Sequence, residues 1–395
     1  NLENVSQSDE ALEARIMDKK HINSLRLEWS GCNNNSTNFQ LEIDVLCKLQ
    51  PHFNIELLHI KGYKGTRFPD WMGNSSYCNM THLALSDCDN CSMLPSLGQL
   101  PSLKFLEISR LNRLKTIDAG FYKNEDCRSG TPFPSLESLS IDNMPCWEVW
   151  SSFDSEAFPV LENLYIRDCP KLEGSLPNHL PALETLDISN CELLVSSLPT
   201  APAIQRLEIS KSNKVALHAF PLLVEIIIVE GSPMVESMME AITNIQPTCL
   251  RSLTLRDSSS AVSFPGGRLP ESLKTLRIKD LKKLEFPTQH KHELLESLEG
   301  LPAPNLIAFS ISGSDKLKSL PDEMSSLLPK LEDLGIFNCP EIESFPKRGM
   351  PPNLRTVWIE NCEKLLSGLA WPSMGMLTHL TVGGRCDGIK SFPKE

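Results

Sequence analysis

Apolar residues recur along this chain in a fixed order: apolar, two variable residues, apolar, one variable residue, apolar. Two copies are Leu161-Glu-Asn-Leu164-Tyr-Ile166 and Leu331-Glu-Asp-Leu334-Gly-Ile336. Because side chains alternate along a strand, the last two apolar residues of each copy share one buried face, and their neighbours face solvent. About fifteen copies begin at Ile22, Ile55, Met80, Leu103, Leu136, Leu161, Leu183, Ile204, Leu223, Leu250, Leu273, Leu306, Leu331, Leu354 and Leu377.

Most copies begin 19 to 27 residues after the previous one, which is the period of a leucine-rich-repeat solenoid. Proline follows an apolar residue in the second half of many copies, as in Leu94-Pro95 and Leu320-Pro321, and proline resists helix continuation. We therefore predict an α/β-type solenoid, a leucine-rich-repeat horseshoe or arc with a parallel concave β-sheet and a mostly irregular or 3-10 convex side.

The first 21 residues lack the repeat. Ser8, Asp9 and Glu10 are suited to the start of a helix that ends near Lys19 and Lys20, where basic side chains favour the helix dipole. We predict an N-terminal helical cap over 1–21 and an irregular solenoid of about fifteen repeats over 22–395. Because the chain starts at Asn1 and stops within the repeat pattern, we expect it to be truncated at both ends.

Two segments within the repeats have helical rather than strand spacing. The long interval after Ile22 contains a predicted helix around Leu41–Leu49, and Met234, Met238 and Ile242 follow the period of a second helix. A methionine stripe can line a binding groove, but packing against a core is the commoner role. We interpret these methionines as packing residues.

Charge and cysteine content narrow the class of protein. The formal net charge of −12 argues against general nucleic-acid binding, which requires a basic surface, and no apolar stretch is long enough to span a membrane. Among the 13 cysteines, five follow the strand pattern at the same place in their repeats and are interpreted as reduced, buried thiols. These five are Cys88, Cys169, Cys191, Cys339 and Cys362.

Candidate binding residues occupy solvent-facing positions of predicted strands. The segment Leu250–Lys291 holds nine Lys or Arg and four Asp or Glu, and Arg256, Arg277 and Lys279 should project from adjacent strands of the concave face. One interpretation is an ordinary solvated face. The functional hypothesis is a basic patch that binds an acidic partner.

Three aromatic residues, Tyr165, Phe337 and Trp358, are also expected on the concave face. Exposed aromatic residues are enriched at the energetic centres of protein interfaces. The alternative is that each ring packs on the side chains of a neighbouring strand. We predict that these residues and the three basic residues form a partner-binding surface.

The sequence contains no complete pattern for catalysis, metal binding or cofactor binding. Cys88-x-x-Cys91 lacks a second ligand pair at zinc-site spacing. Gly383–Lys390 resembles a phosphate loop, but its lysine is misplaced and Pro393 interrupts the helix that should follow. We expect no enzyme activity, no metal and no cofactor in this segment.

Several strings in roughly the first 150 residues are more specific than a general repeat. They include Leu97-Gly98, Phe133-Pro-Ser-Leu-Glu137 and Trp147-Glu148. The stretch resembles the leucine-rich-repeat domain of plant coiled-coil nucleotide-binding leucine-rich-repeat (CC-NB-LRR) disease-resistance proteins. The resemblance implies a sensor and autoinhibitory domain of a cytoplasmic, or nucleocytoplasmic, immune receptor.

The resemblance also implies the partners. These are a pathogen effector or a guarded host protein, and the receptor's own nucleotide-binding domain in cis. It implies that ATP or ADP binds in an upstream domain and not in this segment.

Two other classes of protein remain open from the sequence. An extracellular leucine-rich-repeat receptor would carry glycans on Asn-x-Ser/Thr triplets such as those at Asn74, Asn79 and Asn90, with paired cysteines. A substrate adaptor of a ubiquitin ligase would require an additional helical segment upstream. An upstream nucleotide-binding loop or a signal peptide would discriminate between them.

Overall fold

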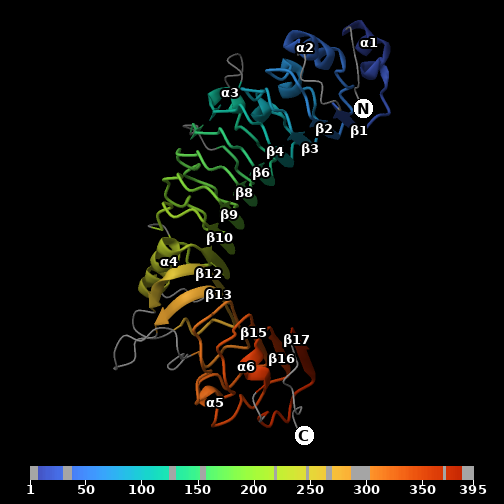
Figure 1. Cartoon of the computed structure of the whole chain (residues 1–395). Helices are drawn as coiled ribbons and strands as arrows, with labels where there is room; N and C mark the ends of the chain where they lie inside the picture. The colour runs from blue at the N-terminus through green and yellow to red at the C-terminus, as the bar shows by residue number, and fades with distance from the viewer. Residues whose placement is uncertain are drawn as a thin grey trace. The chain divides into compact units, whose positions relative to one another are not determined.

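The fold is known from a computed structural model. The structure describes residues 8–29, 38–123, 130–151, 157–217, 220–245, 249–263, 269–285, 303–367 and 371–384. The chain divides into two compact units, one formed by 1–204 with 214–219 and the other by 205–213 with 220–395. Each unit is a stack of coils, and each coil contributes one strand (Figure 1).

Fifteen parallel strands follow chain order in the main sheet, which confirms the predicted solenoid. The first unit contains β1 (Ser24–Glu28), β2 (Leu57–Lys61), β3 (His82–Ser86), β4 (Phe105–Ser109), β6 (Ser138–Asp142), β8 (Asn163–Arg167) and β9 (Thr185–Ser189). The second contains β10 (Arg206–Ser210), β11 (Ile226–Glu230), β12 (Ser252–Ser263), β13 (Thr275–Glu285), β14 (Ala308–Ser312), β15 (Asp333–Phe337), β16 (Thr356–Glu360) and β17 (His379–Gly383).

Neighbouring strands pair without offset within each unit. Leu164 of β8 lies opposite Leu139 of β6, for example, and Val357 of β16 lies opposite Leu334 of β15. From β2 to β16 the second and fourth residues of each strand therefore form continuous buried rows, whereas positions one, three and five belong to the other face of the sheet. The buried rows include Leu83, Leu85, Leu139, Ile141, Leu164, Ile166, Leu276, Ile278, Leu334, Ile336, Val357 and Ile359.

One repeat begins a residue later than the sequence pattern indicated. The predicted start at Leu223 is wrong, because the side chain of Leu223 is 55% exposed whereas that of Val224 is buried. The chain reads Leu222-Leu223-Val224 at this point, and the following strand is apolar at four consecutive positions. An uninterrupted apolar run does not fix which residues face the core.

The side of the coils away from the strands holds short helices and turns. The 3-10 turns η2 (Asp70–Gly73) and η3 (Leu97–Gln99) and the single-turn helix α3 (Ala119–Tyr122) lie in the first unit. The second contains α5 (Met324–Leu327) and α6 (Glu363–Ser367). A small second sheet pairs β5 (Thr116–Ile117) with β7 (Val149–Trp150) in the first unit. The predicted irregular or 3-10 side is confirmed by these elements.

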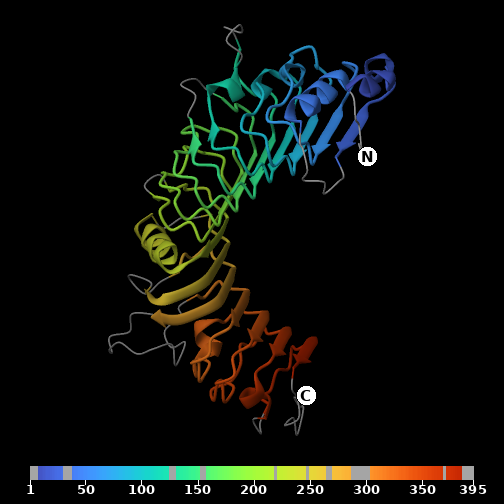
Figure 2. The same ribbon diagram turned by 45° about the horizontal axis from the view of Figure 1, so that its top comes forward.

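Two longer helices confirm the helical spacing read from the sequence. Helix α2 (Phe39–Lys48) corresponds to the segment predicted around Leu41–Leu49, and α4 (Ser232–Ile245) contains the methionine stripe. Met234 and Met238 are buried, so they pack as predicted. Figure 2 shows α2 and α4 beside the coils of their respective units.

The N-terminal helix is shorter than the sequence indicated. Helix α1 covers Ser8–Glu13, and a 3-10 turn, η1 (Ile16–Asp18), follows it. Arg15 between them has a φ of 42°. A left-handed residue cannot continue an α-helix, so the helix stops before Lys19 and Lys20.

The residue after the fifth strand position is a corner with left-handed backbone geometry. It directly follows the five-residue strands and lies within the longer strands β12 and β13. This holds for every strand of the main sheet from β2 to β17. The corner residues are Gly62, Asp87, Arg110, Asn143, Asp168, Asn190, Lys211, Gly231, Asp257, Asp280, Gly313, Asn338, Asn361 and Gly384. Gly, Asn and Asp dominate this list because they tolerate positive φ best. The corner amide continues the ladder, as where Asn338 donates to the Glu360 carbonyl at 2.9 Å.

The residue after the corner explains the repeated cysteines. Cys88, Cys169, Cys191, Cys339 and Cys362 are buried there, as predicted. Each thiol donates to the carbonyl of the last strand residue, from 3.1 Å for Cys169 to 3.4 Å for Cys362. Ser212 occupies the same place and donates to the Ser210 carbonyl at 3.0 Å. A small side chain with one donor satisfies this position.

Candidate functional site

The exposed sheet face of the second unit contains a depression across β13, β14, β15 and β16. Its volume is about 370 Å³. Small residues form its floor, because Ser310 and Gly335 lie side by side at position three of their strands. Arg277 and Trp358 occupy the same position on the two outer strands. The depression is lined by Thr275, Leu276, Arg277, Ala308, Phe309, Ser310, Asp333, Leu334, Gly335, Phe337, Thr356 and Trp358.

The structure brings together three of the six residues predicted from sequence, namely Arg277, Phe337 and Trp358. The Trp358 side chain is 51% exposed, although its strand neighbours Val357 and Ile359 are buried. An indole with this much exposure contributes little to the core. About half of the Trp358 surface is therefore open to solvent, and the other half is covered by the chain.

Phe337 is half-buried because its ring turns back over its own strand. A Cβ atom placed on Gly335 would lie 2.5 Å from Cε2 of Phe337. The ring can take this position only because Gly335 has no side chain. Phe337 therefore forms part of the depression's lining instead of pointing straight into solvent.

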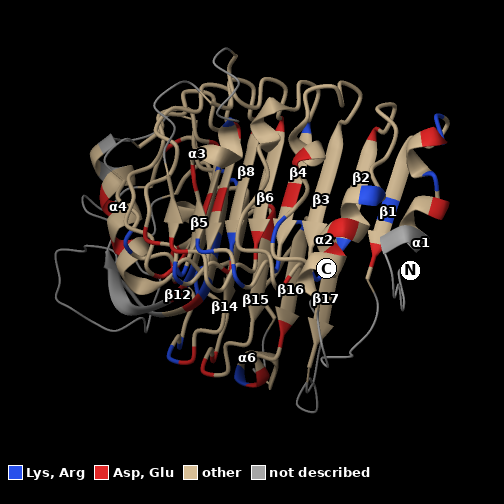
Figure 3. Ribbon diagram, turned by 90° about the horizontal axis from the view of Figure 1, so that it is seen from above, with Lys and Arg blue, Asp and Glu red and all other residues tan. Residues whose placement is uncertain are grey.

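The basic side chains differ in how far they are neutralised. Arg277 and Lys279 are both exposed, and neither forms an ion pair with another described residue. Arg256 is half-buried, and its Nη1 lies 3.7 Å from Oε1 of Glu208 on β10. Two unpaired cations therefore remain beside the depression, whereas Arg256 is partly compensated. Figure 3 shows the Lys and Arg segments near β12 in blue.

The opposite end of the depression is acidic. Asp333 lines it from position one of β15, and Glu360 is exposed at position five of β16, in register with Phe337. The surface is therefore polarised along the direction that crosses the strands. Arg277 and Lys279 lie on β13, which also carries the exposed Asp280 beyond them, and Asp333 and Glu360 lie on β15 and β16.

Tyr165, the sixth predicted residue, belongs to the first unit. The guanidinium carbon of Arg167 lies 4.7 Å from the centre of its ring, a cation–π geometry. Arg167 is in turn paired with Asp187, whose side chain accepts from Nε of Arg167 at 2.7 Å and from the Ser189 hydroxyl at 2.5 Å. Asp187 is only 4% exposed. This network fixes Tyr165 on the sheet face.

A second depression in the first unit is lined by Tyr165, and its other lining residues were not predicted from the sequence. It spans β1 to β8 with a volume of about 600 Å³. Leu57 and Phe105 are exposed there, and His82 stacks on Phe105 with ring centres 4.4 Å apart. The signal that could have found it is the run of large residues at position one of β2, β3 and β4, since that position faces solvent.

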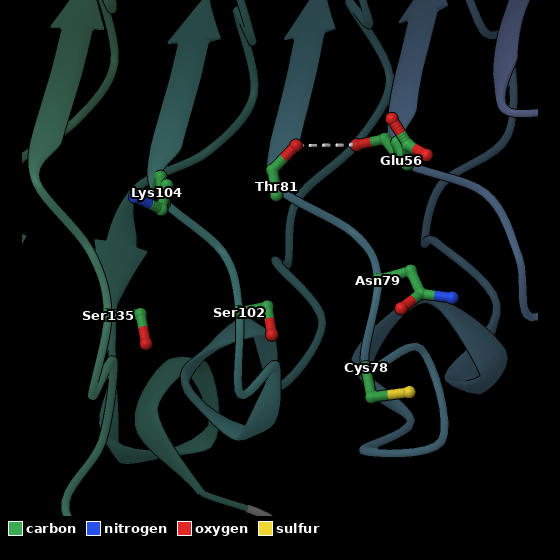
Figure 4. A pocket seen from close by; sticks show the side chains of 7 residues that line it. All are labelled: Glu56, Cys78, Asn79, Thr81, Ser102, Lys104 and Ser135. Carbon is green, nitrogen blue, oxygen red and sulfur yellow. Dashed lines mark hydrogen bonds between the residues drawn. The ribbon is translucent and has the colours of Figure 1, made fainter.

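A third, polar depression lies where the chain enters β2, β3 and β4 (Figure 4). The Thr81 hydroxyl donates to the Glu56 carbonyl at 3.2 Å, and Nζ of Lys104 lies 2.6 Å from Oε1 of Glu137. Asn79, the first residue of an Asn-x-Ser/Thr triplet, is exposed in this depression. The polar groups of Thr81 and Lys104 are thus already engaged within the protein.

The Cys88-x-x-Cys91 pair is used for packing. Cys88 donates to the Ser86 carbonyl at 3.3 Å, and Cys91 donates to the Gly65 carbonyl at 3.2 Å. The neighbouring Cys88 thiol and burial raise the pKa of Cys91. Within the described part of the chain, no group of three or more His, Cys, Asp or Glu side chains is placed to hold a metal ion.

Two known families of leucine-rich repeats match segments of this chain. The family described as R13L1/DRL21 leucine-rich repeats matches residues 1–111. The leucine-rich repeats described as plant disease resistance protein RPS2-like match residues 66–192. Residues 1–192 are thus similar to the leucine-rich repeats of plant disease-resistance proteins.

Individual relatives agree with this assignment. The disease-resistance RPP13-like protein 1 of Arabidopsis thaliana is 40% identical over 192 residues, which cover 46% of this chain and 18% of that protein. A second disease-resistance protein of Arabidopsis thaliana is 27% identical and covers 99% of this chain, which corresponds to 34% of its own length. Disease resistance protein RGA2 of Solanum bulbocastanum is 33% identical over 43% of this chain and 18% of its own.

The chain therefore spans between about a fifth and a third of these relatives. Among solved structures, a leucine-rich repeat protein from Bacteroides thetaiotaomicron matches with a TM-score of 0.39 and 13% identity, over 86% of this chain and 44% of that one. The family resemblance predicted from the first 150 residues is confirmed by the sequence relatives.

The residues that carry the family resemblance are structural. Gly98 lies so close to the next coil that a Cβ atom would be 2.3 Å from the Tyr122 carbonyl oxygen. Phe133 stacks on Phe158 with ring centres 4.9 Å apart, and Nε1 of Trp150 donates to the Tyr122 hydroxyl at 2.6 Å. These motif residues thus contribute to an aromatic core on the side away from the strands.

The repeats themselves are a non-catalytic module. Their chemistry is that of surfaces, with floors of small residues and walls of aromatic and charged side chains. In the residues that the structure describes, no helix is both long and apolar enough to cross a membrane.

Proposed function

We propose that this chain is the sensor and autoinhibitory repeat domain of an intracellular plant immune receptor. In this role it binds a pathogen effector or a guarded host protein on the exposed sheet face, and it binds the receptor's own nucleotide-binding domain in cis. The family supports this proposal, because the relatives are disease-resistance proteins and the matched segment is their repeat region. We place the receptor in the cytoplasm or nucleus on the same grounds.

One observation supports a specific binding surface for the partner. Arg277, Phe337 and Trp358 converge on one depression of the second unit. Arginine and large aromatic side chains are the residue types enriched at interface hot spots. The depression has a half-exposed indole on β16 and, on β13, a guanidinium that forms no ion pair with another described side chain. A surface used only for solubility has no need of this combination.

The proposal is tested by screening the intact chain against secreted proteins of plant pathogens and against host proteins that effectors modify. A partner should bind with an affinity that falls about tenfold or more in Trp358→Ala. Phe105→Ala, on the exposed face of the first unit, is the matched control and should bind normally. The proposal fails if every protein that binds is indifferent to Trp358→Ala and to Arg277→Glu.

A further inference from the structure

We infer that the depression of the second unit binds an extended peptide segment with a fixed order of side chains: acidic, then apolar or aromatic, then basic. The inference rests on the proposed function, because it names the chemistry of the partner at the same surface. It concerns a segment of a partner protein and not a small molecule. It is based on the order in which charged and aromatic side chains occur across β13, β14, β15 and β16.

The depression is open in the direction that crosses the strands. Arg277, Ser310, Gly335 and Trp358 occupy one register row on β13, β14, β15 and β16. The two middle residues are small, and the ring of Phe337, which lies over Gly335, forms the surface between the guanidinium and the indole. A peptide can therefore lie across the strands and contact both ends.

The spacing of the two ends sets the spacing of the peptide's side chains. Three strand intervals of about 4.8 Å place Arg277 and Trp358 roughly 14 Å apart. An extended chain advances about 3.3 Å per residue, so about four residues separate the two contacts. The acidic residue and the aromatic residue should therefore stand about four positions apart in the peptide.

The first contact is electrostatic. Arg277 and Lys279 stand two positions apart on β13, both exposed and without an ion pair to any other described side chain. Two adjacent cations match one or two carboxylates, and arginine can bind a carboxylate with two parallel hydrogen bonds. This end of the depression selects acidic residues.

The second contact is apolar. The ring of Phe337 lies over Gly335, and the exposed indole of Trp358 stands on the next strand at the row of Gly335. The Phe337 ring covers Gly335, and together with the indole on the next strand it forms an aromatic site. A leucine, phenylalanine or tyrosine side chain fits such a site and gains from burial and ring stacking.

The third contact gives the direction. Asp333 lines the depression on β15, and Glu360 is exposed beside Phe337 on β16. These carboxylates repel an acidic residue at the aromatic end and favour a basic one. The charge pattern therefore distinguishes an acidic–apolar–basic segment from one of the same composition in another order.

The test uses the intact chain and a fluorescein-labelled peptide, Asp-Asp-Ser-Gly-Ser-Phe-Lys, in fluorescence anisotropy. Three peptides of related composition are compared with it: one with the acids adjacent to phenylalanine, one with alternating charges, and one with alanine in place of phenylalanine. The ordered peptide should bind about tenfold or more tightly than each of the other three.

Charge-reversed and truncated variants locate the contacts. Arg277→Glu with Lys279→Glu should weaken binding about tenfold, and binding should no longer weaken as strongly between about 50 mM and about 200 mM salt, because the attraction at this end is lost. Trp358→Ala should weaken binding of the ordered peptide but leave the alanine peptide unchanged. Arg26→Glu, an exposed cation on β1 of the first unit, is the matched charge control and should bind the ordered peptide like the parent chain.

Three results would overturn the inference. They are equal binding of all four peptides, loss of binding in Arg26→Glu to the same extent as in the β13 variants, or no binding of the ordered peptide to a chain whose circular dichroism spectrum shows it folded. A whole protein that binds in a Trp358-dependent way while the ordered peptide does not would leave the proposed function standing and refute this peptide order.

Discussion

The ring of Phe337 lies over Gly335, two positions earlier on β15. A Cβ atom on Gly335 would meet Cε2 of that ring at 2.5 Å and Cζ at 3.0 Å. The glycine thus decides where the aromatic side chain lies. It does so without a special backbone conformation, since its role is to leave space on the sheet face.

We therefore predict that Gly335→Ala moves the Phe337 ring without unfolding the chain. Alanine is better suited to a strand than glycine, so the free energy of unfolding should change by less than about 1 kcal/mol. Binding of the ordered peptide should nevertheless fall about tenfold. Chemical denaturation and anisotropy measure the two quantities, with Ser312→Ala on β14 as the control. Unfolding, or unaltered peptide binding, would contradict the role given to Gly335.

The corner after β15 provides a test of backbone strain. Asn338 has a φ of 51°, and its side-chain oxygen accepts a hydrogen bond from the side-chain Nδ2 of Asn361 at 2.8 Å. Asn338→Val should destabilise the chain by about 1–3 kcal/mol, because a β-branched residue is strained at positive φ. Asn338→Gly should cost less than about 1 kcal/mol, because glycine adopts this conformation freely. Equal effects of the two substitutions in urea denaturation would exclude the backbone explanation.

The cysteine after that corner should be replaceable by serine but not by a larger residue. Cys339 donates to the Phe337 carbonyl at 3.2 Å, and Ser212 makes the same bond in its own coil. Cys339→Ser should therefore change the free energy of unfolding by less than about 1.5 kcal/mol. Cys339→Leu should cost about 1–3 kcal/mol through overpacking. A serine variant less stable than the leucine variant would show that the donor is not what the site requires.

His59 should make the first unit sensitive to weak acid. Burial, and then the charge of Arg26, lower the pKa of His59 below its usual value near 6.5. The neutral form is favoured in the fold, where Nε2 lies 3.0 Å from the Ser86 hydroxyl oxygen. Stability is therefore complete above about pH 6.5 and declines as the pH falls from there through the lower folded pKa, because the unfolded chain binds the proton first.

The measurement is urea denaturation at about pH 7.5 and about pH 5.5. His59→Gln should lose less stability between the two values than the parent chain. His379→Gln, a histidine exposed on β17, is the control and should follow the parent chain. An identical decline in all three proteins would assign the acid sensitivity to other groups.

The sequence was sufficient to predict the strands because the alternating apolar residues of each repeat identify its buried face. The pattern failed by one residue at Leu223, where consecutive apolar residues remove the alternation on which the register depends. The left-handed corners were not predicted, although their Asn, Asp and Gly residues are regular in sequence. Arg110 and Lys211 occupy two of them, which obscures the rule when one chain is read alone.

The candidate surface was only partly predictable, for reasons of sequence distance. The position of Arg277, Phe337 and Trp358 on the exposed face follows from the strand period. The compensation of Arg256 by Glu208 does not, because the two are 48 residues apart in the chain and meet only across intervening β11. The turn of Phe337 over Gly335 also requires the three-dimensional structure.

The left-handed corners have a consequence for how such a chain can change. From β2 to β17, each coil has restricted backbone geometry at the corner after the fifth strand position, and its main buried contacts come from alternate strand residues. Most residues at positions one, three and five carry neither requirement, with exceptions such as Asp187 and Gly335. Substitutions there can alter what the surface recognises while the coil stays intact, so new specificity can accumulate one side chain at a time without a compensating change in the core.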